Sequence, residues 1–351
     1  MVRFASCFFL LLLFCSFLFL FVFVFVVLKA KTKKKLKHER NKQTNMKFKL
    51  RIKNASEVVC VRMDGSRIAV GPTEMKRVDR IKGPASIVVT EDGRIFAVGT
   101  DQEVERKVGE GATFEADVDA HGGCVLPGFV DAHTHPVWSG DRVHEFAMKL
   151  GGATYLEIHK AGGGIGFTVG HTRASGEAEL SELLRKRLDR MVAQGTTLAE
   201  AKSGYGLDTE TELKMLRVIH GTRHAGVELV STFLGAHSVP AGKTSAEQTE
   251  LILGEMVPAV KAAAEAGQIR PEFVDVFHEA GVFDASETRR ILEAGRAIGL
   301  EASFHGDELH HVGSAELAGE IGAAAVSHLE EVSDAGRSEE RRVGKECRSR
   351  W

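Results

Sequence analysis

From Leu126 onward the chain alternates short apolar runs with amphipathic helical stretches, and this alternation constrains its fold more than any other feature. The apolar runs predict strands at 128–135, 196–206, 227–240, 272–283, 301–309 and 323–333. Helices are predicted at 180–195, 211–226, 251–266, 286–298 and 314–321. This order is typical of an α/β protein with a parallel sheet, because parallel neighbours need a crossover, usually a helix. Polar residues gather where the strands end, which predicts a (β/α)8 barrel that here stops after about six strands.

The segment ahead of the barrel has a different texture. Residues 46–125 hold short runs of β-branched residues broken by Gly, Asp and Asn, and "EDGR" at Glu91–Arg94 is a hairpin signal. We therefore expect a small N-terminal β-sandwich domain at 46–125 and the incomplete barrel at 126–333. A leader at 1–45 and a tail at 334–351 fit neither domain.

The leader is open to three interpretations. Cys7–Leu28 is 22 uncharged, almost wholly apolar residues, long enough to span a bilayer, and the Lys-rich flank would then be cytoplasmic. A signal peptide fits less well, because no small-residue cleavage site follows the long run. We favour translated untranslated-region sequence, because a Phe/Leu block followed by a Lys/Asn block reflects pyrimidine-rich and then A-rich codons. The tail has no strand or helix period and is interpreted as non-family sequence joined to a truncated gene.

Charge and cysteine usage narrow the function classes. The chain carries −2, residues 1–45 carry +8 and residues 334–351 carry +2, so residues 46–333 carry −12. A core this acidic is a poor partner for nucleic acid, whose binding needs Lys and Arg against phosphates. Cys60 and Cys124, the core cysteines, show no paired spacing, which argues against a disulfide framework and favours a reducing, cytoplasmic location. No membrane partner is expected unless the leader is a real anchor.

Histidines end most of the predicted strands. His133 and His135 lie one residue apart in "HTH", and residues two apart on a strand face the same side. Other strand ends carry His237, His278, His305 and His328. Two imidazoles on one face, joined by a third from another strand, suit Zn²⁺ or Fe²⁺. "HGDE" at 305–308 would add a ligand and a carboxylate that can move protons.

Five segments in order carry a resemblance to a known family. They are "DAHTHPVWSGDRVHEF", "GGGIGFTV", "EAKSGYGL", "FLGAHSVP" and "SFHGDELHHVGSAELAGEIGAAAVSHLE". "LPGFVDAHTH" after a β domain resembles the amidohydrolase superfamily, and the full set resembles its imidazolonepropionase family over nearly all of residues 50–333. The fold implied is the TIM-type amidohydrolase barrel.

The resemblance implies roles for eight residues. The metal ligands would be His133, His135 and His305; the substrate contacts Arg142, Tyr205 and His237; the proton-handling pair Glu308 and His328. One divalent ion, zinc or iron, is implied, because the fourth strand ends without the Lys that bridges two metals in other members. An Arg also suits the propionate of the implied substrate, because a guanidinium binds a carboxylate through two parallel hydrogen bonds.

The implied reaction is the hydrolysis of 4-imidazolone-5-propanoate to N-formimidoyl-L-glutamate in histidine degradation, with metal-bound hydroxide as nucleophile. Family members commonly pair, so a homodimer is an expectation from the resemblance alone. Two alternatives stay open. One is a purine or pyrimidine deaminase, which would need no anion clamp at Arg142. The other is an inactive truncated fragment, since the family's last ligand is an Asp after strand eight and Asp334 lies too early to be that residue.

Overall fold

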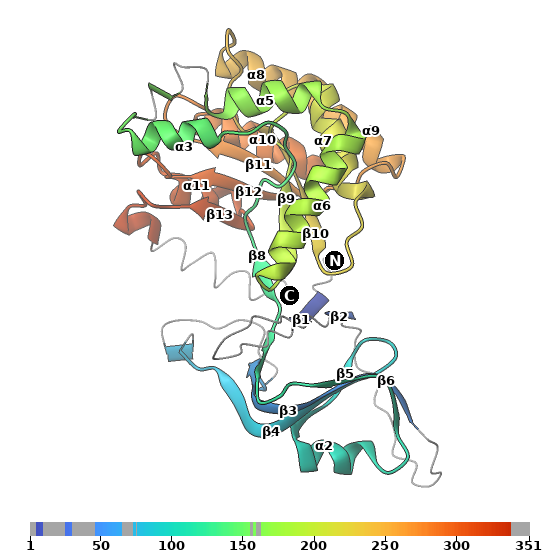
Figure 1. Cartoon of the computed structure of the whole chain (residues 1–351). Coiled ribbons are helices and arrows are strands. Elements are labelled where there is room, and N and C mark those ends of the chain that lie inside the picture. The colour runs from blue at the N-terminus through green and yellow to red at the C-terminus, as the bar shows by residue number, and fades with distance from the viewer. Residues whose placement is uncertain are drawn as a thin grey trace. The chain divides into compact units, whose positions relative to one another are not determined.

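The computed structural model describes residues 5–9, 25–29, 46–64, 73–74, 76–154, 157–158 and 163–337. The predictions for the leader and the tail fall mostly outside these residues. The chain divides into two compact units (Figure 1). The N-terminal unit comprises the residues up to Val130 with Arg190–Leu198 and Ala225–Val227, and the rest forms the second unit.

The N-terminal unit is built on one sheet. Its strands are β1 (Ala5–Phe9), β2 (Phe25–Lys29), β3 (Lys47–Val61), β4 (Asp79–Val89), β5 (Ile95–Thr100), β6 (Thr113–Asp119) and β7 (Cys124–Pro127). They run in the order β2-β1-β7-β3-β4-β5, with β6 pairing the first half of β3. The predicted hairpin at Glu91–Arg94 joins the antiparallel strands β4 and β5. All described strands of this unit belong to one seven-stranded sheet, so the predicted sandwich of two sheets is not confirmed.

Both faces of this sheet are partly covered. Leu50, Ile52 and Val58 alternate along β3 and lie in one apolar cluster. The other face packs under α2 (Asp101–Val108), whose buried Val104 lies in an apolar cluster with Val88 and Ala97. Thr100 caps this helix through a reciprocal pair of hydrogen bonds with Glu103, which satisfies amides that a helix start leaves unpaired.

The second sheet has six strands in sequential order. They are β8 (Phe129–Asp131), β9 (Thr196–Lys202), β10 (Glu228–Ala236), β11 (Phe273–His278), β12 (Glu301–Gly306) and β13 (Ala325–His328). The pairs from β10 to β13 are parallel. The predicted α/β fold with a parallel sheet is therefore confirmed, and each new strand joins the edge beside the one before it, as in a curling barrel wall (Figure 1).

Helices connect the strands of this sheet. They are α3 (Val143–Leu150), α5 (Ile165–Ala174), α6 (Glu177–Ala193), α7 (Thr209–Gly221), α8 (Ser245–Leu251), the π-helical turn Ile252–Met256, α9 (Val257–Glu265), α10 (Ala285–Ala297) and α11 (Ser314–Ile321). The sequence predicted one long connection after the first strand, whereas the structure places α3 and α5 there. None of the described helices combines the length and apolar character that crossing a membrane requires.

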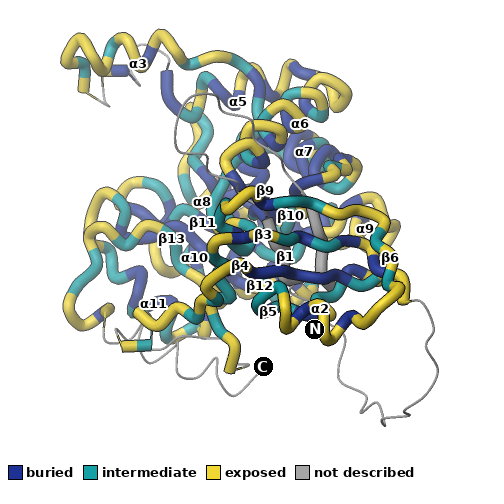
Figure 2. Tube along the Cα trace, turned by 60° about the horizontal axis from the view of Figure 1, so that its bottom comes forward, coloured by how far each residue is buried: buried dark blue, intermediate teal, exposed yellow. Residues whose placement is uncertain are grey.

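The central strands are buried on both faces, as parallel strands under helices should be. Every residue of β9 except Glu200 is buried, and Figure 2 shows this strand mostly in dark blue. On the outer side α10 approaches β11 so closely that a Cβ at Gly295 would lie 2.4 Å from Cγ1 of Val274. This contact requires glycine.

Gly295→Ala should therefore destabilise the protein by about 1–3 kcal/mol, the usual effect of overpacking a tight core. Gly221→Ala is the matched control, because a Cβ on Gly221, also in a helix, meets nothing within 4 Å. Urea unfolding of both variants measures the difference. Equal stability of the two would contradict the close packing of α10 on β11.

Candidate metal centre

The carboxyl ends of the strands bring the predicted site residues together. His305 lies in β12 and His328 is the last residue of β13. His133 and His135 were predicted to lie on the first strand, which is wrong in detail. Strand β8 ends at Asp131, so both histidines follow it, and the backbone amide of His133 donates to Asp131 instead.

Three histidines form a cluster that could hold a metal ion. His133, His135 and His305 each offer one ring nitrogen, and these atoms lie within 4.8 Å of one another. Nε2 of His135 and Nε2 of His305 are 3.2 Å apart. Two nitrogens bound to one tetrahedral ion at roughly 2.1 Å would lie about 3.4 Å apart, so this spacing suits a pair of ligands.

The chemical state of these imidazoles also fits metal binding. Burial, and then the charge of His305, lowers the pKa of His133 to about 3. Burial and the charge of His237 hold the pKa of His135 well below its usual range. Both rings are therefore neutral near pH 7, as ligands must be. Their Nδ1 atoms are buried without a hydrogen-bond partner among the described residues.

Two predicted substrate contacts lie beside the cluster. The ring of His237 stacks on that of His135 at 4.6 Å, and Tyr205 meets His237 edge-on at 5.1 Å. Nδ1 of His237 bonds the carbonyl of Gly204 at 2.9 Å, which fixes the ring. Burial lowers the pKa of His237 to about 3. Burial raises the pKa of Tyr205, although the positive charge of Arg142 opposes the shift.

The predicted proton-handling pair adjoins the cluster on its other side. The ring of His328 lies 5.1 Å from that of His133 and 5.2 Å from that of His305. Nε2 of His328 is 3.5 Å from Oε2 of Glu308. The backbone of His328 has φ of 77°, in the left-handed region that non-glycine residues avoid. Such strain is most often found at functional sites, where surrounding contacts hold it.

Arg142 lies close enough to Tyr205 to affect its pKa, but the structure pairs it with another group. Its Nε and Nη2 donate to the two carboxylate oxygens of Glu145 at 2.8 and 2.6 Å. Glu145 also accepts from the backbone amide of Gly164 at 2.9 Å. The predicted anion clamp is thus held in place by a buried carboxylate.

The residues beneath the cluster were not predicted from the sequence. Asp275 accepts from Nδ1 of His305 at 2.8 Å and from Nζ of Lys202 at 2.5 Å. Lys202 also donates to Glu200 at 2.7 Å. Burial would raise the pKa of Asp275, but attraction to His305 and Lys202 outweighs it and holds this pKa far below its usual range. The available signal was a lone Asp in the otherwise apolar strand "FVDVF".

Two further buried carboxylates fix the loops that carry site residues. Glu212 accepts from the amides of Gly204, Gly206 and Leu207 at 2.7–3.0 Å, and these flank Tyr205. Glu279 accepts from the amide of Leu309 at 2.9 Å, directly after Glu308. Loop amides that would otherwise need water are thus paired with the protein itself.

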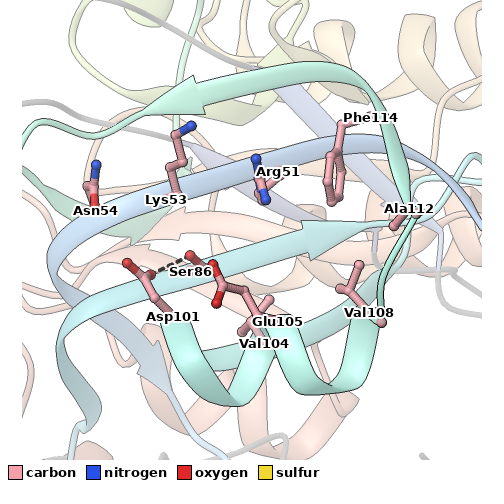
Figure 3. Close-up of a pocket in the computed structure, with 12 residues that line it drawn as sticks. Arg51, Lys53, Asn54, Ser86, Asp101, Val104, Glu105, Val108, Ala112 and Phe114 are labelled. Atoms are coloured by element: carbon pink, nitrogen blue, oxygen red, sulfur yellow. Dashed lines mark hydrogen bonds between the residues drawn. The ribbon is translucent and has the colours of Figure 1, made fainter.

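A separate cavity of about 220 Å³ lies in the N-terminal unit, between α2 and the sheet (Figure 3). Arg51 and Lys53 on its wall both pair with Asp117, at 2.5 and 3.3 Å. No histidine or cysteine lines it. Asp117 thus pairs with both basic residues of the cavity wall, and the histidine cluster is the stronger candidate for a catalytic site.

Comparison with known proteins agrees with this assignment. No protein-family model matches the chain. A protein of Dictyostelium discoideum named probable imidazolonepropionase is 53% identical over 291 residues, which are 82% of this chain and 67% of that protein. The Homo sapiens protein of the same name is 52% identical over 288 residues, with 82% and 67% covered. The chain thus spans about two thirds of the length of these relatives.

Among solved structures, guanine deaminase from C. acetobutylicum with bound guanine aligns with a TM-score of 0.49 and 13% identity, over 84% of this chain and 65% of that one.

A parallel sheet that gathers imidazoles where its strands end is an arrangement typical of metal-dependent hydrolases. Identity above 50% over four fifths of the chain then decides the family. The chain belongs to the imidazolonepropionase family. The prediction of this family over a purine or pyrimidine deaminase is confirmed.

The buried neutral His237 predicts a pH-dependent stability of the metal-free protein. Its pKa is about 3 when folded and about 6.5 when unfolded, so the unfolded state binds more protons as the pH falls below 6.5. The free energy of unfolding should therefore fall with pH, by about 2 kcal/mol at pH 5 relative to pH 8 from this residue alone. Urea unfolding of chelator-treated protein between pH 8 and 5 measures the effect. His237→Gln should show a smaller fall; an identical pH dependence would contradict a buried, neutral His237.

Proposed function

We propose that the chain opens the ring of 4-imidazolone-5-propanoate by hydrolysis and yields N-formimidoyl-L-glutamate, a step of histidine degradation. The observation that carries the proposal is the convergence of His133, His135 and His305 beside Glu308 and His328. The architecture proposed is the TIM-type amidohydrolase barrel over 126–333, preceded by the β domain at 46–125.

His133, His135 and His305 would hold one divalent ion, zinc or iron. Such an ion supplies Lewis acidity, which makes water a nucleophile near neutral pH and polarises the carbonyl that is attacked. Neutral imidazoles suit either metal, and the described ligand set contains no thiolate that would favour one.

The protein's own groups would handle the protons. Glu308 would accept a proton as water adds to the ring carbonyl carbon and return it to the ring nitrogen as the C–N bond breaks, so that one water is consumed and no other reactant is needed. His328, 3.5 Å from Glu308, would donate a hydrogen bond to the oxyanion that develops on the carbonyl oxygen. The left-handed backbone conformation of His328 supports a fixed orientation of its ring.

Substrate orientation would fall to Arg142, Tyr205 and His237. Arg142 is matched to the propionate by charge, and its pairing with Glu145 holds the guanidinium in place. The ring of His237 stacks on that of His135, and the ring of Tyr205 contacts His237. Arg142 lies close enough to Tyr205 for its charge to affect the tyrosine pKa.

We also propose a cytoplasmic location and a homodimer. Cys60 and Cys124 are free thiols, in keeping with a reducing compartment. The homodimer rests on family resemblance alone.

Glu308→Gln tests the proposed proton transfer. The amide keeps the size of the side chain and cannot accept the proton, so kcat should fall by roughly 10²–10⁴-fold with the bound metal retained. The assay follows loss of imidazolone absorbance and formation of N-formimidoyl-L-glutamate by metal-loaded protein.

Glu331→Gln, an exposed neighbour, is the control and should keep wild-type kcat. Guanine and cytosine serve as control substrates. Absence of ring opening by the metal-loaded chain, or release of ammonia from either base, would contradict the proposal.

A further inference from the structure

A buried ionic bridge lies beneath the histidine cluster and has no part in the chemistry proposed above. Lys202, the last residue of β9, is only 1% exposed. Its Nζ donates to Oε1 of Glu200 at 2.7 Å and to Oδ2 of Asp275 at 2.5 Å. A buried ammonium is retained only where carboxylates compensate its lost hydration, so the three residues depend on one another.

The bridge determines which nitrogen of His305 faces the cluster. Oδ1 of Asp275 accepts from Nδ1 of His305 at 2.8 Å. A carboxylate can only accept, so the proton sits on Nδ1 and Nε2 keeps its lone pair. That Nε2 is the atom 3.2 Å from Nε2 of His135. A histidine ligand is commonly oriented in this way by a carboxylate behind it.

The backbone of the strand end that carries the bridge also holds the segment with the other two histidines. The backbone amide of Lys202 donates to the carbonyl of Thr134 at 3.1 Å. The hydroxyl of Thr134 donates to the carbonyl of Glu200 at 2.5 Å. Since Thr134 stands between His133 and His135, both rings are tied to the strand end where the bridge begins.

The spacing of the strands explains why a lysine is present. Strand β10 lies between β9 and β11, so the backbones joined by Lys202 and Asp275 are about 9–10 Å apart. A long cationic side chain can cross that distance on the concave face of the sheet. Thr232 of β10 adds its hydroxyl to Oε1 of Glu200 at 2.6 Å, which brings the intervening strand into the bridge.

We propose that Asp275 and Lys202 are positioning residues of the metal site: Asp275 fixes the ring and tautomer of His305, and Lys202 fixes Asp275. The inference rests on the proposed function of the histidine cluster. It adds two residues, neither of which touches substrate, on which metal affinity should depend.

Asp275→Asn tests this directly. An amide can present oxygen to His305 only by turning its NH₂ group toward the ammonium of Lys202, and the reverse orientation puts the proton on the wrong nitrogen of His305. Zinc affinity at pH 7, measured by calorimetric titration or by competition with a chromophoric chelator, should fall by roughly 10–100-fold. In ¹⁵N-histidine spectra of the metal-free protein, His305 should lose its Nδ1–H signature.

Glu212→Gln is the matched control, because it also removes a buried carboxylate charge but contacts none of the three histidines. It should lower Tm and leave zinc affinity unchanged. If Asp275→Asn lowers Tm in the same way and keeps its zinc affinity within twofold of wild type, its role is structural only and the inference is overturned.

Lys202→Met serves if Asp275→Asn does not fold, since it removes the ion pair and leaves the bond between Asp275 and His305. A several-fold weaker zinc affinity is expected, and an unchanged affinity would contradict the inference. Failure of the wild-type chain to bind zinc would instead contradict the proposed metal site. The tautomer of His305 in the metal-free wild type would then still decide the role of Asp275: an Nε2–H form would overturn it.

Discussion

The geometry of the site depends on one buried interaction, the ammonium of Lys202 held between Glu200 and Asp275. It joins strands that are not neighbours, and it therefore favours a curled sheet over a flat one. Through Asp275 it orients His305, and the backbone of the same strand end bonds Thr134. Apolar residues of similar size would stabilise the fold equally well, because the attraction within a buried ion pair does little more than offset the cost of removing its charges from water. Its retention is better explained by the position it gives to the ligands.

The α/β fold class and the histidine cluster could be predicted from the sequence because both depend on local patterns. Strand–helix alternation predicts a parallel sheet, and "HTH" places two imidazoles on one side even though β8 ends before them. The supporting residues could not be predicted. Asp275 and Lys202 are 73 residues apart, and only the curl of the sheet brings them together. Glu145, which holds Arg142, looked like an ordinary acidic residue on a helix.

Buried carboxylates that accept loop amides occur at several positions around the site. Glu212 and Glu279 are buried and accept backbone amides of loops that carry a predicted site residue, and the buried Glu145 accepts one loop amide and pairs with Arg142. A carboxylate that collects several amides makes a loop rigid without adding apolar bulk at the mouth of the sheet. The site therefore keeps its polar lining and its fixed geometry together, which is what preorganised catalysis requires.

The central claim is that three imidazoles from two segments of the chain hold one catalytic metal. X-ray absorption spectroscopy of the zinc-loaded protein tests it most directly. We expect one zinc per chain, coordinated by about three imidazole nitrogens at roughly 2.0–2.1 Å. A shell of sulfur or of oxygen alone, or zinc that is lost on simple dialysis, would contradict it.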